Sequence, residues 1–370
     1  MRDGFAPLRG KRVGLLTNPS GVTRDLTRTL DVFRAKDVPF TLAALFTPEH
    51  GLAAAVADGA SVNSSVDPVS GAPVYSLYGE TFAPTAEMLS DIDVMVCDIQ
   101  DIGVRYYTYA WTISHVLNAA GLVGVPVILL DRPNPLGDTV DGALLDRRYE
   151  SLVGGAPVPV QHGMTLGELM ALVNDLYNTD KADLTVIRCE GCERDMPWEA
   201  TGLTFVPPSP AMPHLSTARQ YPGACLIEGT NLSEGRGTAL PFEISGAPYV
   251  DAEDLAAHLN GLHLEGVRFR PHAFTPSAGK FAGQECQGVQ VHVVGRAFRA
   301  LTTWMQVIRA ASTLYPADFA FKPGTFDRLY GSDAGRAWVE SGAGIEALEG
   351  AWAADAAAWR SRRSGYLLYR

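Results

Sequence analysis

The stretch from Asp91 to Pro135, "DIDVMVCDIQDIGVRYYTYAWTISHVLNAAGLVGVPVILLDRPNP", decides the fold. Two short apolar runs, Val94–Cys97 and Val125–Leu130, enclose a segment, Tyr106–Ala120, whose apolar and aromatic residues recur at roughly i, i+3 and i+4. Short runs of branched apolar residues are typical of buried strands, and the second spacing is typical of a helix that packs on a sheet. This order of strand, helix and strand favours a parallel sheet.

The same alternation extends over the first half of the chain. Three further runs have the composition of strands, Val13–Leu16, Phe40–Phe46 and Leu184–Ile187, and two further segments have that of helices, Thr23–Ala35 and Thr165–Tyr177. We therefore predict an α/β fold with a doubly wound, mostly parallel sheet. In such sheets ligands bind at the carboxyl ends of the strands, so the residues that follow each strand are the candidates for a site.

Composition limits the class of protein. A chain of 370 residues with 46% hydrophobic and 19% charged residues is typical of a globular protein of about two domains. A net charge of -11 and a pI near 5.2 argue against binding to nucleic acid or to an anionic membrane surface. No apolar stretch is long enough to insert into a bilayer. Because the N-terminus lacks the pattern of a secretory signal, we expect a cytoplasmic protein as written, or an exported one if a leader has been trimmed.

The second half of the chain has a different character. A proline-rich passage, "FVPPSPAMPHLSTARQYPGA", begins at Phe205, and we place the domain junction there. The predicted domains are residues 1–205 and residues 206–370. In the second domain, "GVQVHVV" alternates like a strand, and Ala334–Arg362, rich in Ala, Trp and Arg, predicts a C-terminal helical element.

Polar side chains follow the predicted strands consistently. Each has a local alternative: Asp101 could cap the next helix, Asn18 and Asn134 precede prolines as turn residues do, and Asp131 could pair with Arg132. Together, however, they bring carboxylates, an imidazole, amides and guanidinium groups to one edge of the sheet. The residues are Thr17, Asn18, Glu49, His50, Asp98, Asp101, Arg105, Tyr107, Asp131, Arg132 and Asn134.

Several common signatures are absent from the sequence. There is no G-x-G-x-x-G, no G-x-x-x-x-G-K-[ST], no G-x-S-x-G and no H-E-x-x-H, which argues against nucleotide binding, serine acyl transfer and zincin chemistry. Five cysteines in a long chain do not form a disulfide framework. Cys189 and Cys192 form a lone C-x-x-C without a second pair or a thioredoxin-like context, so we predict neither a metal site nor a redox site at this motif, and we predict no cofactor.

A glycine-rich segment of the second domain, "EGTNLSEGRGT", is a further candidate. Glu228, Asn231, Glu234 and Arg236 lie between glycines, which allow a backbone to turn tightly and to approach a ligand. The alternative is a solvated hairpin loop.

Eight motifs carry a resemblance to a known family. The stretches "GLLTNPSGV", "FTPEHGL", "DIQDIGVRYYTY", "LLDRPNPLG", "VQHGMTLGEL", "PSPAMPHLSTARQYPG", "EGTNLSEGRGT" and "YLLY" resemble the NamZ-type (YbbC-like) exo-β-N-acetylmuramidases, which are peptidoglycan hexosaminidases. The resemblance runs in order from about residue 10 to the C-terminus. It implies a Rossmann-like N-terminal domain, a smaller C-terminal α+β domain and an active-site cleft between them. It also implies release of terminal N-acetylmuramic acid from the non-reducing end of peptidoglycan fragments.

The residues suit that chemistry. Glycoside hydrolysis normally needs one protonated carboxyl group as general acid and a second group as nucleophile or base. We predict Glu49 as the acid, because burial at an apolar strand end favours the proton-bearing form of a carboxyl group; His50 would then orient a ligand or the backbone. The second group is either Glu234 or Asp98. A third route uses the acetamido oxygen of the sugar itself, with Asp98 or Asp101 holding the amide.

Muramic acid also carries a lactyl ether with a carboxylate. A guanidinium group binds a carboxylate through two hydrogen bonds, and Arg105 and Arg236 are the candidates, although either could instead pair with a structural carboxylate. Tyr107 could offer its ring or its hydroxyl to the sugar. The candidates for contacts with hydroxyl and acetamido groups are Asn18, Asn134, Asn231 and His162.

Two other classes of function stay open at this point. One is a metal-dependent hydrolase with Glu49, His50, Asp98 and Asp101 as ligands, since mixed oxygen and nitrogen ligands suit a divalent ion. The other is a non-catalytic protein that binds muropeptides. The sequence leaves the oligomeric state undetermined.

Overall fold

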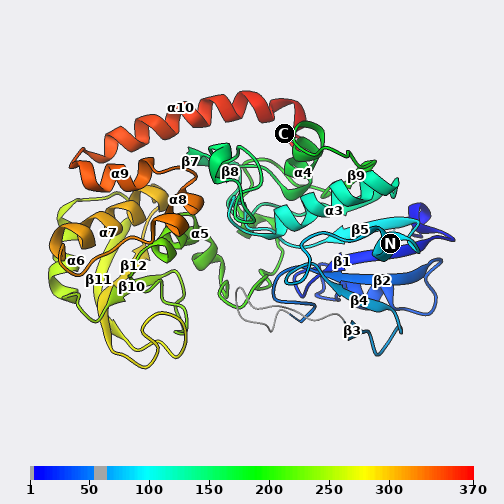
Figure 1. Cartoon of the computed structure of the whole chain (residues 1–370), viewed down its shortest axis with the longest axis horizontal. Coiled ribbons are helices and arrows are strands. Elements are labelled where there is room, and N and C mark those ends of the chain that lie inside the picture. The colour runs from blue at the N-terminus through cyan, green and yellow to red at the C-terminus, as the bar shows by residue number, and fades with distance from the viewer. Residues whose placement is uncertain (1–3, 54–64) are drawn as a thin grey trace.

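The computed structural model describes residues 4–53 and 65–370. Two lobes lie side by side, with the N-terminal half of the chain in one and most of the C-terminal half in the other (Figure 1). Within the described residues, the first lobe contains a sheet of seven strands in the order β3-β4-β2-β1-β5-β6-β9. The strands are β1 (Arg12–Thr17), β2 (Thr41–Thr47), β3 (Ser65–Val66), β4 (Pro73–Ser76), β5 (Val94–Asp98), β6 (Val127–Leu130) and β9 (Leu184–Ile187).

The sheet is parallel except at one edge, where β3 runs antiparallel to β4. The chain winds outward from β1 in both directions, which is the doubly wound order that the sequence predicts. The interior strand β5 is buried along its whole length, as a continuous apolar run requires. The carboxyl ends of β1, β2 and β5 therefore present Asn18, Glu49 and Asp98 at one edge.

Helices cover the two faces of this sheet unequally. The short α1 (Thr29–Phe33) packs with the N-terminal segment on one face, whereas α3 (Tyr109–Val123) and α4 (Leu166–Leu176) pack on the other. The short α2 (Ala86–Leu89) precedes β5. A capping box at Thr165 and Glu168 fixes the start of α4.

The second lobe is a smaller α+β unit. Its sheet of three antiparallel strands, all in described residues, has the order β10-β12-β11. The strands are β10 (Ile244–Ala247), β11 (Val267–Phe274) and β12 (Cys286–Val293). The helices are α5 (Leu215–Ala224), α6 (Ala252–Gly261), α7 (Ala300–Leu314), α8 (Pro323–Tyr330), α9 (Ala334–Ser341) and α10 (Ile345–Arg363).

The two lobes are joined over a broad contact. The largest hydrophobic cluster in the described part of the chain includes Trp111 of the first lobe and Trp304 of the second. The long helix α10 runs along the top of the molecule from the second lobe back to the first (Figure 1), where it contacts the two-stranded ribbon of β7 (Val140–Leu144) and β8 (Pro159–His162). The C-terminal residues then end beside α4.

Short 3-10 helices complete the secondary structure. They are η1 (Ala6–Leu8), η2 (Arg147–Tyr149), η3 (Trp198–Thr201), η4 (Cys225–Gly229) and η5 (Ser364–Tyr366).

Three predicted helices differ in their bounds. Only residues 29–33 of the segment Thr23–Ala35 are helical, because Leu26 has a positive φ of 64° and the Thr23 hydroxyl accepts a hydrogen bond from the Thr27 amide, which makes a turn. The helix predicted from Tyr106 begins at Tyr109. The C-terminal element is divided into α9 and α10 at Gly342, whose φ is 74°.

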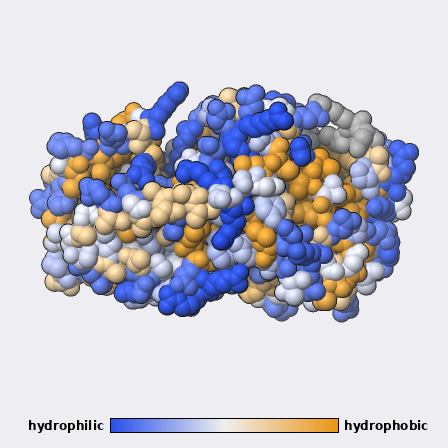
Figure 2. Space-filling model, turned by 90° about the horizontal axis from the view of Figure 1, so that it is seen from above, coloured by the Kyte–Doolittle hydropathy of each residue, from blue (hydrophilic) through white to orange (hydrophobic). Residues whose placement is uncertain are grey.

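The predicted domain junction near residue 205 stays a prediction. Among the described residues, no helix has the length and apolar character needed to cross a membrane. Figure 2 shows the face that carries α10, on which hydrophobic residues gather more over the half that belongs to the first lobe.

Candidate active site

A cavity of about 420 Å³ lies between the two lobes. That volume is typical of a pocket for a small ligand. The first lobe supplies Glu49, His50 and the segment Tyr106–Tyr109, and the second supplies side chains from α5, η4, the 228–238 loop and Lys280. Five predicted site residues meet here: Glu49, His50, Tyr107, Glu234 and Arg236.

Glu49 and His50 lie in the turn that follows β2. Both are buried, with 9% and 4% of their surface exposed. His50 has a positive φ of 71°, a conformation that costs free energy for any residue with a side chain and that is enriched at functional sites. The Thr108 hydroxyl donates a hydrogen bond of 2.8 Å to Glu49 Oε2, so the carboxyl group is held in one orientation.

The opposite wall carries charged groups of both signs. Arg236 donates to Glu228 Oε1 from Nε at 3.0 Å and from Nη2 at 2.8 Å. Lys280 Nζ lies 3.1 Å from Glu234 Oε2, and Arg236 Nε lies 3.7 Å from Glu234 Oε1. The Arg236 guanidinium also lies over the ring of Phe242, 4.8 Å from its centroid. Two glutamates and two cations therefore form one network beside the cavity.

Backbone geometry explains why this loop is rich in glycine. Gly235 and Gly237 have φ values of 80° and 78°, in the region that other residues rarely adopt. Added Cβ atoms would lie 2.7 Å from Ile244 and 2.5 Å from Ala278. The loop therefore needs glycine at both positions to bring Glu234 and Arg236 to the cavity.

Burial shifts the protonation equilibria of this wall. It raises the pKa of Glu228, an effect that the neighbouring Arg236 opposes. It lowers the pKa of Lys280, an effect that Glu234 opposes. Both shifts have the sign that desolvation of a charged group predicts.

Tyrosines form much of the remaining wall. Those that line the cavity are Tyr78, Tyr106, Tyr107, Tyr109 and Tyr221. Tyr107 and Tyr109 are in edge contact, with their centroids 4.8 Å apart. The hydroxyl of Tyr106 donates to the main-chain oxygen of Pro222 in α5, so this side chain joins the two lobes. Aromatic walls of this kind offer flat apolar surfaces together with polar groups at their edges.

The three predicted asparagines lie outside the cavity and bind main-chain segments. Each donates to a carbonyl oxygen: Asn18 to that of Pro208 at 3.2 Å, Asn134 to that of Met164 at 3.0 Å, and Asn231 to that of Asp318 at 2.7 Å. Asn18 thereby positions the segment that follows Pro208, from which Ser209 and Met212 line the cavity. Asn134 lies against Gly103, where a Cβ atom would come within 2.1 Å of its amide oxygen.

Asp98 faces a different cleft, of about 670 Å³, on the side of the sheet that α1 covers. It accepts hydrogen bonds of 2.7 and 3.0 Å from Arg132 and another from the Thr29 hydroxyl. The structure therefore pairs Asp98 with Arg132 and does not bring it to the cavity of Glu49.

Asp101 and His162, both predicted site residues, are buried together and do not line the cavity. His162 Nε2 lies 3.9 Å from Asp101 Oδ2, and this carboxylate oxygen accepts the Gly103 amide at 2.7 Å. Burial raises the pKa of Asp101 to about 7. Burial, with a contribution from Arg363, lowers the pKa of His162 to about 3, so the imidazole is neutral at pH 7.

Arg105 does not offer its guanidinium group to a ligand. The side chain is 1% exposed and donates four hydrogen bonds of 2.7–2.8 Å to main-chain oxygens. The acceptors are Ala143 and Val158 in the ribbon region, and Leu329 and Tyr330 at the end of α8. Arg105 is thus a bridge between segments that are far apart in the sequence.

Thr108 and Lys280, which contact the two predicted catalytic glutamates of the cavity, were not among the predicted residues. Thr108 lies within "DIQDIGVRYYTY", but its contact depends on Glu49, which is 59 residues away. Lys280 stands alone in "SAGKFAG", a stretch whose composition indicates only a loop. Nothing in the local sequence would have placed either side chain beside a glutamate.

The four residues considered as metal ligands do not meet at one point. Glu49 and His50 line the cavity, whereas Asp98 and Asp101 lie in the separate environments described above. Over residues 4–53 and 65–370, no group of three or more His, Cys, Asp or Glu side chains is placed to hold a metal ion.

Residues 13–216 match the family model described as exo-beta-N-acetylmuramidase NamZ, N-terminal, and residues 219–369 match the C-terminal model of the same family. The chain belongs to the NamZ family. It is 44% identical over 366 residues to the peptidoglycan beta-N-acetylmuramidase NamZ of Bacillus subtilis (strain 168), which is 98% of this chain and 88% of that relative.

Solved structures agree with this membership. Crystal structures of two DUF1343 family proteins from Bacteroides fragilis NCTC 9343 are similar to this NamZ-family chain over its whole length and over 97% of theirs. The TM-scores are 0.91 at 36% identity and 0.80 at 29% identity. The predicted α/β class, with a parallel sheet and a smaller second domain, is confirmed.

Proposed function

We propose that this chain is an exo-acting glycoside hydrolase that releases terminal N-acetylmuramic acid from the non-reducing end of peptidoglycan fragments. Membership of the NamZ family supports this activity. The observation that carries the proposal is the position of Glu49, buried at the end of β2 in a cavity that also holds Glu234 of the other lobe.

Glu49 is the proton donor in this mechanism. A glycosidic oxygen needs a proton as the bond to the anomeric carbon breaks, and a carboxyl group held at the cavity wall can deliver it. The hydrogen bond from Thr108 to Oε2 fixes the carboxyl plane. His50, strained and buried beside it, fixes the turn.

Glu234 is the partner carboxylate. It approaches the cavity from the second lobe, and Lys280 at 3.1 Å offsets its charge. In this position it can stabilise the positive charge that develops on the sugar ring or act on the anomeric carbon. Asp98 is engaged by Arg132 in another cleft, so we do not assign it a step.

In this mechanism, Arg236 binds the lactyl carboxylate of muramic acid. Among the cationic side chains that line the cavity are Arg236 and Lys280, and a guanidinium group is suited to bind a carboxylate. Tyr107 and Tyr221 would contact the sugar ring from the same side.

The test is product release from N-acetylmuramyl-β-1,4-N-acetylglucosamine, measured for wild type and Glu49→Gln with and without a chelator. We expect free N-acetylmuramic acid from wild type, the same rate in chelator, and a rate lower by about 10²–10⁴ in the variant. Glu87→Gln, an exposed glutamate in α2, is the matched control and should keep the wild-type rate.

Other results would redirect the proposal. A Glu49→Gln enzyme with wild-type activity would show that Glu49 is only a turn residue. A loss of rate in chelator that Mg²⁺ or Mn²⁺ restores would favour a metal-dependent hydrolase. Saturable binding of muramyl saccharides without any product would favour a binding protein.

A further inference from the structure

The "CEGC" turn is a feature that the proposed hydrolase mechanism does not use. It follows β9, and Cys189 and Cys192 line the 670 Å³ cleft rather than the candidate active site. Both thiols are partly exposed, whereas the other cysteines of the chain, Cys97, Cys225 and Cys286, are buried.

The turn brings the two thiols together. Gly191 has a φ of 70°, which lets the chain reverse between the cysteines. Cys189 and Cys192 are the first and fourth residues of this turn, so both side chains leave one short segment. The two neighbouring thiols affect each other's acidity: the pKa of Cys192 is lowered and that of Cys189 is raised. The Cys189 sulfur also lies 3.1 Å from the main-chain oxygen of Asp131. This is the arrangement of a dithiol in which one sulfur attacks first and the other resolves.

The same turn holds the end of the chain. The Cys189 amide donates to the Tyr369 hydroxyl at 2.9 Å, and this hydroxyl donates to Asp131 Oδ2 at 2.7 Å. The Arg194 amide donates to the Arg370 main-chain oxygen at 2.7 Å. The tail, residues 366–370, is therefore docked on the segment that contains the two cysteines.

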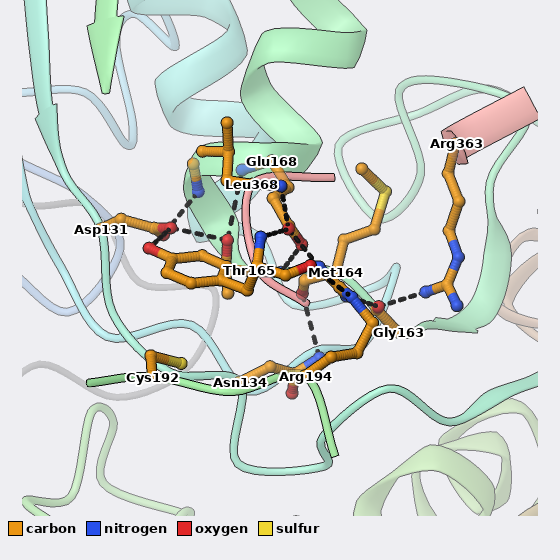
Figure 3. Close-up of polar contacts among 12 residues, drawn as sticks. Asp131, Asn134, Gly163, Met164, Thr165, Glu168, Cys192, Arg194, Arg363 and Leu368 are labelled. Carbon is orange, nitrogen blue, oxygen red and sulfur yellow. Dashed lines mark hydrogen bonds and ion pairs between the residues drawn. The ribbon is translucent and has the colours of Figure 1, made fainter. Parts of the chain in front are cut away.

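Buried carboxylates complete the docking site (Figure 3). Glu168 accepts a hydrogen bond of 2.6 Å from the Leu368 amide and forms an ion pair with Arg194. Asp131 accepts a hydrogen bond of 2.7 Å from the Thr165 hydroxyl. In the figure Cys192 lies on the same segment as Arg194, beside this network. A change in the turn would therefore reach the tail through the Cys189 amide, which donates to the Tyr369 hydroxyl, and through the Arg194 amide two residues after the turn.

We propose that Cys189 and Cys192 are a redox-active pair that closes to an intramolecular disulfide, and that the disulfide fixes the turn on which the C-terminal tail is docked. With oxidised glutathione as the oxidant, the Cys192 thiolate attacks one glutathione sulfur, and a glutathione thiolate leaves and takes up a proton. Cys189 loses its proton and attacks the Cys192 sulfur, which releases the second glutathione. The protein loses two hydrogen atoms and two glutathione molecules form.

The first experiment treats the reduced full-length chain with oxidised glutathione and maps its disulfides by mass spectrometry after acid quench. We expect one Cys189–Cys192 bond. In the native reduced protein, N-ethylmaleimide should label these two thiols and leave Cys97, Cys225 and Cys286 unlabelled. The Cys189→Ser variant lacks the second thiol, so the mixed disulfide between Cys192 and glutathione should accumulate. Absence of the bond in wild type, or bonds that involve the buried cysteines, would overturn the proposal.

The second experiment measures hydrogen exchange of residues 366–370 in the reduced and oxidised protein. We expect at least a threefold slower exchange after oxidation, and no change in Cys192→Ser treated in the same way. Equal exchange in both states of wild type would overturn the link to the tail. Glu49→Gln should give the same results as wild type, so a failure of the proposed glycosidase function would not affect this test.

Discussion

The Thr108 hydroxyl and the Glu49 carboxyl group are joined by a hydrogen bond of 2.8 Å. Thr108 is the residue before α3, and Glu49 lies in the turn after β2, so the bond connects the segments that follow β5 and β2 at one edge of the sheet. It occupies one oxygen of the glutamate and thereby sets the direction of the other. Thr108 is a positioning residue in the mechanism that we propose.

Substitution of Thr108 tests that role. Thr108→Val keeps the shape of the side chain but removes the donor, and we expect kcat to fall about tenfold to a hundredfold while KM changes little, because orientation and not binding is lost. Thr108→Ser should restore most of kcat. A variant that lost stability without this split between kcat and KM would indicate a structural role only.

Glu234→Gln tests the partner carboxylate. We expect a loss of about 10²–10⁴ in kcat, since the amide cannot carry the negative charge that the mechanism needs. The unfolding midpoint should fall only slightly, because Lys280 keeps its bonds to the main-chain oxygens of Ile227 and Leu232. A fully active Glu234→Gln enzyme would favour attack by the substrate's own acetamido group, which NMR of the first-formed anomer can then examine.

Asp98→Asn should lower the stability of the protein and leave its kcat nearly unchanged, the reverse of Glu234→Gln. Asp98 is 1% exposed and the side chain of Arg132 is 16% exposed. Removal of the charge of Asp98 therefore leaves the largely buried guanidinium group of Arg132 without its carboxylate partner. We expect a loss of about 3–5 kcal/mol in the free energy of unfolding, measured with urea, and a near-normal kcat well below the melting temperature. A large loss of kcat in a stable protein would return Asp98 to the list of catalytic groups.

The sequence predicts the sheet better than the site because the two depend on different information. Strands such as β5 are specified by local composition, and the alternation of strands and helices then sets their parallel order. By contrast, the direction of a side chain at a strand end depends on neighbours that are remote in the sequence. Asp98 ends β5 and Glu49 follows β2, the two strands that flank β1, yet the side chains face different cavities because Arg132 holds the first and Thr108 holds the second.

The arginines illustrate the same limit. Arg105 and Arg236 both lie in polar, glycine-containing stretches and were both predicted to bind the lactyl carboxylate. Only the three-dimensional structure shows that Arg105 donates to four main-chain oxygens, two of them more than 220 residues away. Without such long-range contacts, site residues can be predicted only from local sequence patterns. Lys280 lies in no sequence motif that indicates a site.

Arg105 should therefore matter for stability. Arg105→Lys keeps the charge but cannot serve four acceptors, so we expect about 2–4 kcal/mol less free energy of unfolding, measured with urea. Arg147→Lys, whose side chain is 68% exposed, is the control and should change that free energy by less than about 0.5 kcal/mol. Loss of N-acetylmuramic acid affinity in Arg105→Lys, with unchanged stability, would contradict the structural role.

The buried Asp101 should make stability depend on pH. Its pKa of about 7 in the folded chain lies above the value near 4 expected when unfolded, so the neutral carboxyl group stabilises the fold fully below about pH 4, and this contribution is lost as pH rises through 7. Asp101→Asn cannot ionise and keeps an acceptor for the Gly103 amide. Between pH 4 and pH 8 the wild type should therefore lose about 2–4 kcal/mol relative to the variant.

The measurement is urea unfolding of both proteins at several pH values, compared as a difference so that titrations common to both cancel. His162 lies 3.9 Å from Asp101 and has the opposite effect, because its lowered pKa makes stability fall as pH drops from about 6.5 toward 3. Because His162 is present in both proteins, its titration largely cancels, and the difference attributed to Asp101 should develop mainly between pH 4 and pH 7. If the two proteins kept a constant difference over that window, Asp101 would not titrate there and its buried carboxyl group would be ionised throughout.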